Sequence, residues 1–266
     1  MTEKELNEKI RIYSQKYILP MYLKDELGNL DFVATLTLVK YKDRYFAITA
    51  AHAIPADYDL NLGIFVNDRN ILTLTQVHRF DNVCDLDLLV LDFAFPIFYE
   101  DRCYYNLDEE YPPDLVFFNT TAFSWHGFPK KTSIDFHKKP VAEMVLNSIK
   151  NGLITTAKSL LVGIPFKERC NLSNEFILGE FSLKNAVYDK AGTKSKGYSL
   201  QGMSGGALCI HKKHLFPLEN SFYFVGMGIE HRKDNTIVGI NRSVIVEKLD
   251  EISNKPIDIS IELMPI

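Results

Sequence analysis

The segment Gly202–Gly206, with the sequence GMSGG, carries the clearest chemical signal in the chain. Glycines on both sides of Ser204 allow its hydroxyl to sit on a tight, uncrowded turn, since glycine tolerates backbone conformations closed to other residues. Gly202 lets that turn direct the amide N–H groups of Gly202 and Ser204 toward one point. Two such amides form an oxyanion hole, which stabilises the charged intermediate of acyl transfer. The segment therefore predicts a nucleophilic serine, and the structural alternative is a glycine-rich hairpin turn.

A serine nucleophile needs a base to take its proton, and His52 is the candidate. It follows the small and apolar residues Ile48–Ala51, which are typical of the end of a β-strand. The small side chains permit close packing and let the imidazole project from the strand end. A single histidine after a strand is usually structural, so this prediction depends on the other two segments.

The third segment, Asp85–Leu91, places an aspartate at the start of a strongly apolar run. A carboxylate at the rim of a core can be held against an imidazole, where it fixes the tautomer and stabilises the protonated ring. Asp87 is the alternative to Asp85, because alternation along a strand could put both side chains on one face. A plain turn aspartate is the structural interpretation of this segment.

Short apolar runs separated by polar turns predict a β-rich chain. Strands are expected over residues 32–39, 45–49, 71–76, 86–93, 115–118, 121–125, 207–210, 222–229 and 236–241. The first two of these form a hairpin around the polar turn 42–44. Helical patterns occur at 3–16 and 242–251, and 141–147 is ambiguous between helix and strand. The acidic, proline-bearing stretch 99–113 indicates a linker, so two small barrels are favoured over a single large one.

Composition argues against several classes of function. The 266 residues include 30 basic and 34 acidic side chains, a net charge of −4, which lacks the basic footprint of a nucleic-acid-binding protein. No apolar run reaches the roughly 20 residues of a membrane helix. The charged N-terminus is unlike a signal peptide and predicts a cytoplasmic protein. The 4 cysteines lack CxxC spacing and predict reduced thiols, and no residue cluster indicates a metal site.

In the order His52, Asp85, Ser204, the three segments resemble those of the chymotrypsin-like (trypsin-like) serine proteases, most of all the compact intracellular bacterial and viral-type members. The resemblance covers roughly residues 18–250. It implies an all-β fold of two six-stranded antiparallel β-barrels, with short N- and C-terminal helices. The implied parts are an N-terminal helix at 1–17, a first barrel at 18–113 with His52 and Asp85, a second barrel at 114–241 with Ser204, and a C-terminal helix and tail at 242–266.

The same resemblance implies a serine endopeptidase that hydrolyses peptide bonds through an acyl-enzyme and needs no cofactor. Ser204 would attack the scissile carbonyl, with His52 as the base. Asp85 would orient the imidazole, favoured over Asp87 by the match to the family's Asp-Leu pattern. Gly202 and Ser204 would supply the oxyanion hole. The residues implied to bind a protein or peptide substrate are Tyr198, Gln201, Gly228, Ile229 and Glu230.

The chain departs from the digestive members of the family near each catalytic motif. Met203 stands where those enzymes carry the aspartate that binds a new N-terminus, and Ala53 stands where they have a cysteine. Both departures predict control by an activating protein partner, oligomerisation or loop movement in place of zymogen cleavage. Tyr198 falls at the base of the implied primary specificity pocket, which predicts no preference for Arg or Lys in that pocket.

Two other interpretations of the sequence stay open. A protease fold could bind a peptide in its cleft without cutting it, as a catalytically silent module. The chain could also be an assembly subunit that docks through its N-terminal helix. A role as an effector or regulatory protease of a bacterial stress or antiviral system rests on analogy with the family alone.

Overall fold

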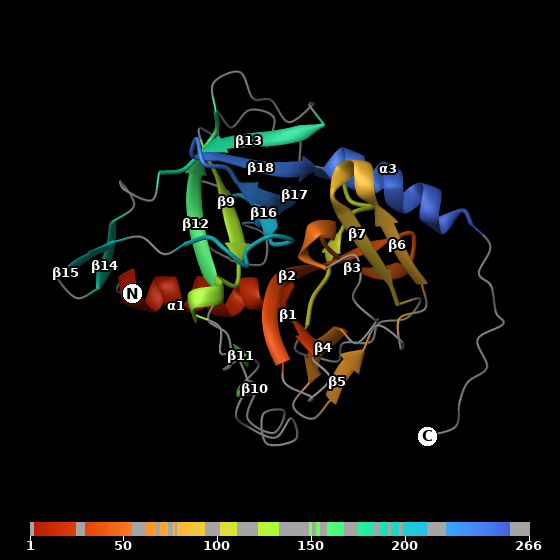
Figure 1. The fold of residues 1–266 in the computed structure, drawn as a ribbon, viewed down its shortest axis with the longest axis horizontal. Helices are drawn as coiled ribbons and strands as arrows, with labels where there is room; N and C mark the ends of the chain where they lie inside the picture. Colours follow the sequence, from red (N-terminus) through yellow and green to blue (C-terminus); the bar gives the residue numbers. More distant parts are fainter. Residues whose placement is uncertain are drawn as a thin grey trace.

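The computed structural model describes residues 3–24, 30–54, 62–67, 70–73, 77, 79–93, 102–110, 122–132, 149–150, 153–154, 159–167, 175–182, 187–190, 193–196, 199–211 and 222–255. In these ranges β-strands dominate, and α-helices lie near both ends: α1 at Glu3–Gln15 and α3 at Arg242–Ser253 (Figure 1). The expected strand 115–118 and the ambiguous segment 141–147 lie outside the described residues.

The first sheet is built from the N-terminal part of the chain. Its eight strands are β1 Ile18–Lys24, β2 Leu30–Tyr41, β3 Arg44–Ala50, β4 Leu62–Asn67, β5 Asn70–Thr73, β6 Arg79–Val83, β7 Leu88–Asp92 and β8 Tyr105–Asn106. Seven of them follow the antiparallel order β5-β4-β1-β2-β3-β7-β6, and β8 pairs with β2 in parallel. All five residues of β7 are buried, because this strand lies between β3 and β6 with the core against it.

The second sheet comes from the C-terminal part. Its six strands are β9 Ala122–Gly127, β12 Leu160–Pro165, β13 Phe176–Glu180, β16 Ala207–His211, β17 Phe222–His231 and β18 Thr236–Asn241, in the order β12-β9-β16-β17-β18-β13. An antiparallel bridge joins Phe166 to Gly179, and the N–H of Lys167 donates to Leu178 O at 2.9 Å. The two outer strands of this sheet therefore meet at one end. Short separate hairpins are β10 Ile149–Lys150 with β11 Leu153–Ile154, and β14 Val187–Lys190 with β15 Thr193–Lys196.

The mostly-β architecture, the antiparallel sheets and the terminal helices predicted from the sequence are confirmed. The first sheet has eight strands where six were predicted. One of the additional strands, β8, lies in the stretch that was interpreted as a linker. Arg102, Tyr105 and Leu107 in that stretch are buried, so its aromatic and apolar side chains outweighed its acidic composition.

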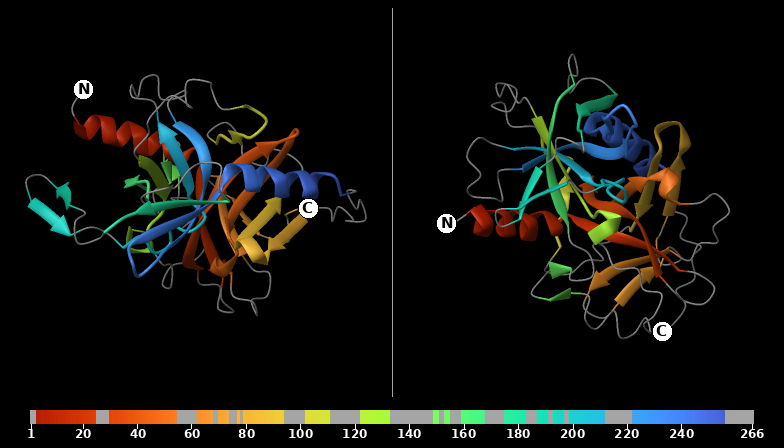
Figure 2. Two further views of the ribbon diagram at one scale, coloured as in Figure 1. Left: turned by 90° about the horizontal axis from the view of Figure 1, so that it is seen from above. Right: turned by 60° about the vertical axis from the view of Figure 1, so that its left-hand side comes forward.

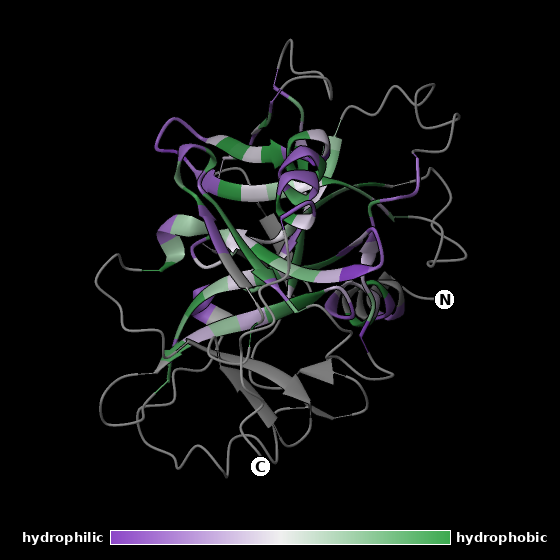
Figure 3. Ribbon diagram, turned by 90° about the vertical axis from the view of Figure 1, so that its right-hand side faces the viewer, coloured by the Kyte–Doolittle hydropathy of each residue, from purple (hydrophilic) through white to green (hydrophobic). Residues whose placement is uncertain are grey.

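The two sheets share one core. The larger cluster of buried apolar residues includes Leu36 and Phe46 from the first sheet, Phe224 and Ile240 from the second, and Ile245 from α3. A smaller cluster lies within the second sheet around the buried Trp125 ring. Figure 3 shows the corresponding apolar stretches, in green, along the central strands. Because strands from both sheets contribute to one cluster, the relative position of the sheets is fixed by packing.

Helices α1 and α3 lie on opposite sides of the molecule (Figure 1 and Figure 2). From α1, the Tyr13 ring stacks on Phe222 of β17 with centroids 5.9 Å apart, and Gln15 O accepts a hydrogen bond from Arg102 Nη1 at 2.6 Å. Helix α1 therefore joins the second sheet to the segment that carries β8. Within the described residues, neither helix combines the length and the apolar character needed to cross a membrane.

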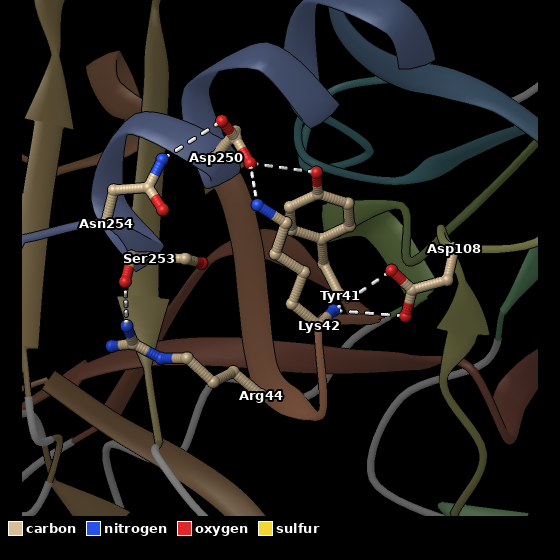
Figure 4. Close-up of polar contacts among 7 residues, drawn as sticks. All are labelled: Tyr41, Lys42, Arg44, Asp108, Asp250, Ser253 and Asn254. Atoms are coloured by element: carbon tan, nitrogen blue, oxygen red, sulfur yellow. Dashed lines mark hydrogen bonds and ion pairs between the residues drawn. The ribbon is translucent and has the colours of Figure 1, made fainter.

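Helix α3 braces the β2–β3 hairpin (Figure 4). Tyr41 Oη donates to Asp250 Oδ1 at 3.1 Å, and the Lys42 ammonium forms an ion pair with the same carboxylate. Arg44 Nη1 donates to Ser253 O at 3.2 Å. The helix thus holds the beginning of β3, the strand that leads to His52.

Candidate active site

His52 lies in a short 3₁₀ turn, Ala51–Ala53, that follows directly on β3. Asp87 contacts this turn through three oxygen atoms. Its backbone carbonyl accepts the N–H of Ala51 at 3.0 Å, its Oδ1 accepts the N–H of His52 at 2.8 Å, and its Oδ2 lies 2.6 Å from His52 Nδ1. One residue therefore fixes the backbone of the turn and the orientation of the ring, and leaves Nε2 as the nitrogen available for proton transfer.

The backbone of Asp87 explains how it reaches His52. Residues Cys84–Leu86 form a 3₁₀ turn, and Asp87 follows it in the left-handed conformation, with φ 54° and ψ 36°. Aspartate and asparagine enter this region more readily than most other residues. Leu88 then begins β7 and pairs with Ala50, the last residue of β3. The reversal at Asp87 thus places its carboxylate against the end of β3, where the histidine turn begins.

The prediction that Asp85 contacts the imidazole is wrong, and its alternative, Asp87, makes the contact. The strand expected from residue 86 begins at Leu88, so residues 84–86 form a turn and do not alternate between faces. Within that turn Asp85 is exposed, and its charge acts on Lys248 of α3. Asp85 was preferred because of the match to the family's Asp-Leu pattern, and the start of the strand was placed two residues too early.

In the loop Gly202–Gly206, three of the five backbone amides donate hydrogen bonds to described residues. The N–H groups of Met203, Gly205 and Gly206 donate to Leu200 O, Gly228 O and Met203 O at 3.0, 2.7 and 2.9 Å. Among the residues that the structure describes, the N–H groups of Gly202 and Ser204 have no acceptor. These are the two amides that the sequence predicts for an oxyanion hole. Gly202 and Gly205 have φ of 90° and 85°, so the loop conformation requires glycine at both positions.

Two buried threonines of β2 anchor this loop, and Thr35 makes most of the contacts. Its N–H donates to Ser204 O at 3.0 Å, and its Oγ1 donates to Gly202 O at 3.0 Å while accepting the N–H of Phe128 at 2.9 Å. Thr37 Oγ1 donates to Gly205 O at 2.7 Å. Both side chains are fully buried, so each of these bonds is protected from water.

The anchoring follows from where two strands separate. The pairing of β2 with β3 reaches Thr37 opposite Ile48 and goes no further. Beyond that point the ladder does not pair the N–H and the carbonyl of Thr35. The N–H donates to Ser204 O instead, and the carbonyl accepts a hydrogen bond from Thr49 Oγ1 at 2.8 Å. The serine loop is therefore wedged between β2 and β3, close to the end of β3.

This wedge brings the serine loop beside the histidine turn. A Cβ on Gly205 would lie 2.9 Å from Thr49 Cα, and Thr49 precedes His52 by three residues. Between these described residues, no hydrogen bond joins Ser204 Oγ to the His52 ring. Hydrogen bonds between catalytic groups are often long without substrate and tighten in the reacting complex. The structure thus brings Ser204, His52 and Asp87 to one region. It forms the hydrogen bond between His52 and Asp87 but not the one between Ser204 and His52.

The electrostatics of His52 follow from its neighbours. Hydrogen bonding to Asp87 raises the pKa of His52 above its usual 6.5, partial burial of the ring opposes the increase, and the negative charges of Asp87 and Glu230 add to it. The side chains of His52 and Asp87 are 53% and 30% exposed. The imidazolium that forms when His52 accepts a proton is therefore stabilised at the site, in contact with solvent.

The residues predicted to bind substrate have different positions. Gly228 donates to Gly206 O at 2.9 Å, so it directly adjoins the serine loop. Ile229 is buried at 6% exposure, which leaves only its backbone for an extended ligand. Glu230 is partly exposed near His52, and Gln201 is exposed in the loop. Tyr198 lies outside the described residues.

The threonine anchors were not identified from the sequence. Their signal is the pattern Thr35-Leu36-Thr37-Leu38, in which hydroxyls alternate with leucines in a part of β2 that is buried throughout. A buried hydroxyl needs a hydrogen-bond partner, so such a pattern indicates a polar segment packed on the strand. The sequence does not say which segment that is.

In the described part of the chain, no group of three or more His, Cys, Asp or Glu side chains could hold a metal ion. The described cysteines Cys84, Cys103 and Cys209 are free thiols.

Neither a protein-family model nor a curated protein matches this chain. The interpretation of the site therefore depends on its own geometry.

Proposed function

We propose that the protein is a serine endopeptidase with Ser204 as nucleophile, His52 as general base and acid, and Asp87 as the orienting carboxylate. The observation that carries the proposal is the pair of amides at Gly202 and Ser204 that find no acceptor among the described residues, in a loop whose other amides are bonded. A merely structural glycine turn has no reason to leave these two donors without acceptors, since unpaired backbone amides cost stability where water is excluded.

The geometry supports the following mechanism. The Ser204 hydroxyl attacks the peptide carbonyl carbon as His52 Nε2 takes its proton, and Asp87 keeps the other ring proton on Nδ1. The carbonyl oxygen becomes an oxyanion and accepts hydrogen bonds from the two loop amides. Collapse of this intermediate breaks the C–N bond as His52 gives its proton to the leaving amine. A water molecule then attacks the acyl-enzyme as His52 takes its proton. His52 returns that proton to Ser204 Oγ as the bond to the acyl group breaks.

The finer description of the fold belongs to the same proposal. The meeting of β12 and β13 at the Phe166–Gly179 bridge supports a second sheet that closes as a barrel. The candidate site lies where this sheet adjoins the first, as expected for a double barrel. The free thiols of the described cysteines fit a reducing compartment, and a cytoplasmic location is part of the proposal.

A peptide-binding module without catalysis is the second candidate function. The observation that favours it is the missing hydrogen bond between the described side chains of Ser204 and His52. In an enzyme, a protein partner or a bound substrate would close this gap by a small rotation of either side chain. In a binding module the gap would persist with a peptide in place.

Labelling with a fluorophosphonate probe separates the two functions. The probe should modify the wild-type protein at Ser204, and Ser204→Ala and His52→Ala should both abolish labelling. Ser243→Ala, which changes an exposed serine on α3, should label like the wild type. If peptides bind to the wild-type protein but neither labelling nor cleavage occurs even with peptide bound, the binding module is the correct function.

A further inference from the structure

Strand β17 has an open edge beside the serine loop. The N–H of Gly205 donates to Gly228 O at 2.7 Å and the N–H of Gly228 donates to Gly206 O at 2.9 Å, and among the described residues these bonds end the pairing on this side. On its other side β17 continues to pair with β18 as far as His231, with a register shift between Gly228 and Glu230. An extended peptide could therefore add to the edge of β17 beyond Gly228.

Glu230 carries the charge on this part of β17. Its side chain is 45% exposed, and its negative charge acts on His52, so it lies near the candidate site. A substrate side chain near His52 would thus experience the field of this carboxylate.

The partner of Glu230 can be displaced. Arg232 Nε forms an ion pair with Glu230 Oε1, and the Arg232 side chain is 54% exposed. Ion pairs between exposed side chains contribute little free energy because water and salt screen them. A cationic group on a bound peptide can therefore take the place of Arg232 at small cost, while the displaced guanidinium stays in water.

We propose that Glu230 selects substrates with a lysine or arginine close to the cleaved bond, at a position other than the residue whose carbonyl is attacked. This inference rests on the proposed peptidase function. Glu230 lies two residues beyond Gly228, and a strand rises about 3.3 Å per residue, so the carboxylate is roughly 7 Å along β17 from the serine loop. The substrate residue beside Glu230 is accordingly one or two positions from the attacked carbonyl.

Peptide sets that differ at one position test the selection. Each set places lysine, glutamate or the uncharged norleucine at a single position on either side of the cleaved bond, and kcat/KM is measured at low salt. The wild-type protein should prefer lysine by about two- to fivefold at one position, as expected for a partly exposed charge pair. Glu230→Gln should remove this preference, and Glu230→Lys should reverse it in favour of glutamate.

Two further variants separate the Glu230 carboxylate from net charge. Arg232→Gln removes the competing cation and should increase the preference for lysine. Glu247→Gln makes the same charge change as Glu230→Gln at an exposed position on α3 and should leave the preference as in the wild type. Equal cleavage of lysine and norleucine peptides at every position would overturn the proposal, as would a preference that survives in Glu230→Gln.

Binding to Ser204→Ala keeps the test independent of catalysis. Fluorescence anisotropy with the same peptides should give the same preference for lysine in Ser204→Ala and lose it in the double variant with Glu230→Gln. A preference in binding without any cleavage by the wild type would reject the peptidase and keep the role of Glu230. Cleavage without a Glu230-dependent preference would reject the role of Glu230 and keep the peptidase.

Discussion

The Ser204 loop and the His52 turn meet at one site, but different interactions hold them. Buried hydroxyls and backbone groups fix the loop: Thr35 and Thr37 are fully buried and bind the carbonyls of Gly202, Ser204 and Gly205. The turn depends on the single residue Asp87, whose side chain is 30% exposed. The loop is thus built into the core, whereas the turn is attached at the surface by the carboxylate and the backbone carbonyl of one residue.

This difference predicts different effects on stability and activity for variants in the two regions. A change in the loop anchors disturbs packing and buried hydrogen bonds, so it should lower the free energy of unfolding together with activity. A change at Asp87 disturbs a partly solvated contact, so it should lower activity while the fold remains. Variants in the two regions therefore test whether the comparison holds.

The largest expected effect is the loss of activity in Asp87→Asn. Asparagine tolerates the left-handed backbone and keeps an oxygen for the His52 N–H, but it cannot stabilise the imidazolium. By analogy with the same change in the triads of serine proteases, we expect kcat/KM to fall on the order of 10³-fold or more. Asp85→Asn is the matched control and should stay within about twofold of the wild type, as a surface change away from the site. A large loss in Asp85→Asn with a small one in Asp87→Asn would restore the prediction made from the sequence.

The second effect is the destabilisation in Gly205→Ala. The new Cβ would lie 2.0 Å from Thr35 O and 2.2 Å from Thr49 Oγ1, at a residue with φ 85°. The left-handed backbone alone costs about 1–3 kcal/mol, and the contact with a backbone oxygen adds to it, so the total should be on the order of 3 kcal/mol in urea unfolding. Gly163→Ala in β12 is the control, because its Cβ would have nothing within 4 Å. Equal stability of the two variants would mean that the loop is not wedged between the strands.

The third effect compares the two threonine anchors of β2. Thr35→Val leaves the Phe128 N–H without its acceptor and Gly202 O without its donor, so we expect a loss of about 2 kcal/mol. Thr37→Val removes one donor from Gly205 O and should cost about 1 kcal/mol. Thermal unfolding measures both, and the order of the two variants is the decisive result. The reverse order would show that Thr35 is not the main anchor.

The smallest effect is a shift in the pH dependence of activity. Asp87 raises the pKa of His52, and His52 must be neutral to act as a base, so kcat/KM should fall as the pH drops through a value above 6.5. Asp87→Asn removes the cause of the increase, so the residual activity should persist to lower pH than in the wild type. Asp85→Asn should leave the profile in place. A profile that is unchanged in Asp87→Asn would show that His52 does not control it.

The sequence predicted the parts of the site whose chemistry is local. The GMSGG segment contains both the proposed nucleophile and the glycines that its turn requires, so a single short segment sufficed. The carboxylate was misassigned because strand boundaries depend on tertiary pairing: β7 begins where it meets Ala50 of β3, at Leu88. The threonine anchors were missed since their partners lie far away in the chain, and a hydroxyl in a buried strand does not name the group it binds.

The distance along the polypeptide between the anchors and the loop has a consequence during protein synthesis. Thr35 and Gly202 are 167 residues apart, and Thr37 and Gly205 are 168 residues apart. Strands β2 and β3 can emerge from the ribosome and pair long before the loop that packs between them has been translated. A growing polypeptide therefore cannot organise the two amides, and the proposed peptidase function requires translation to pass residue 206.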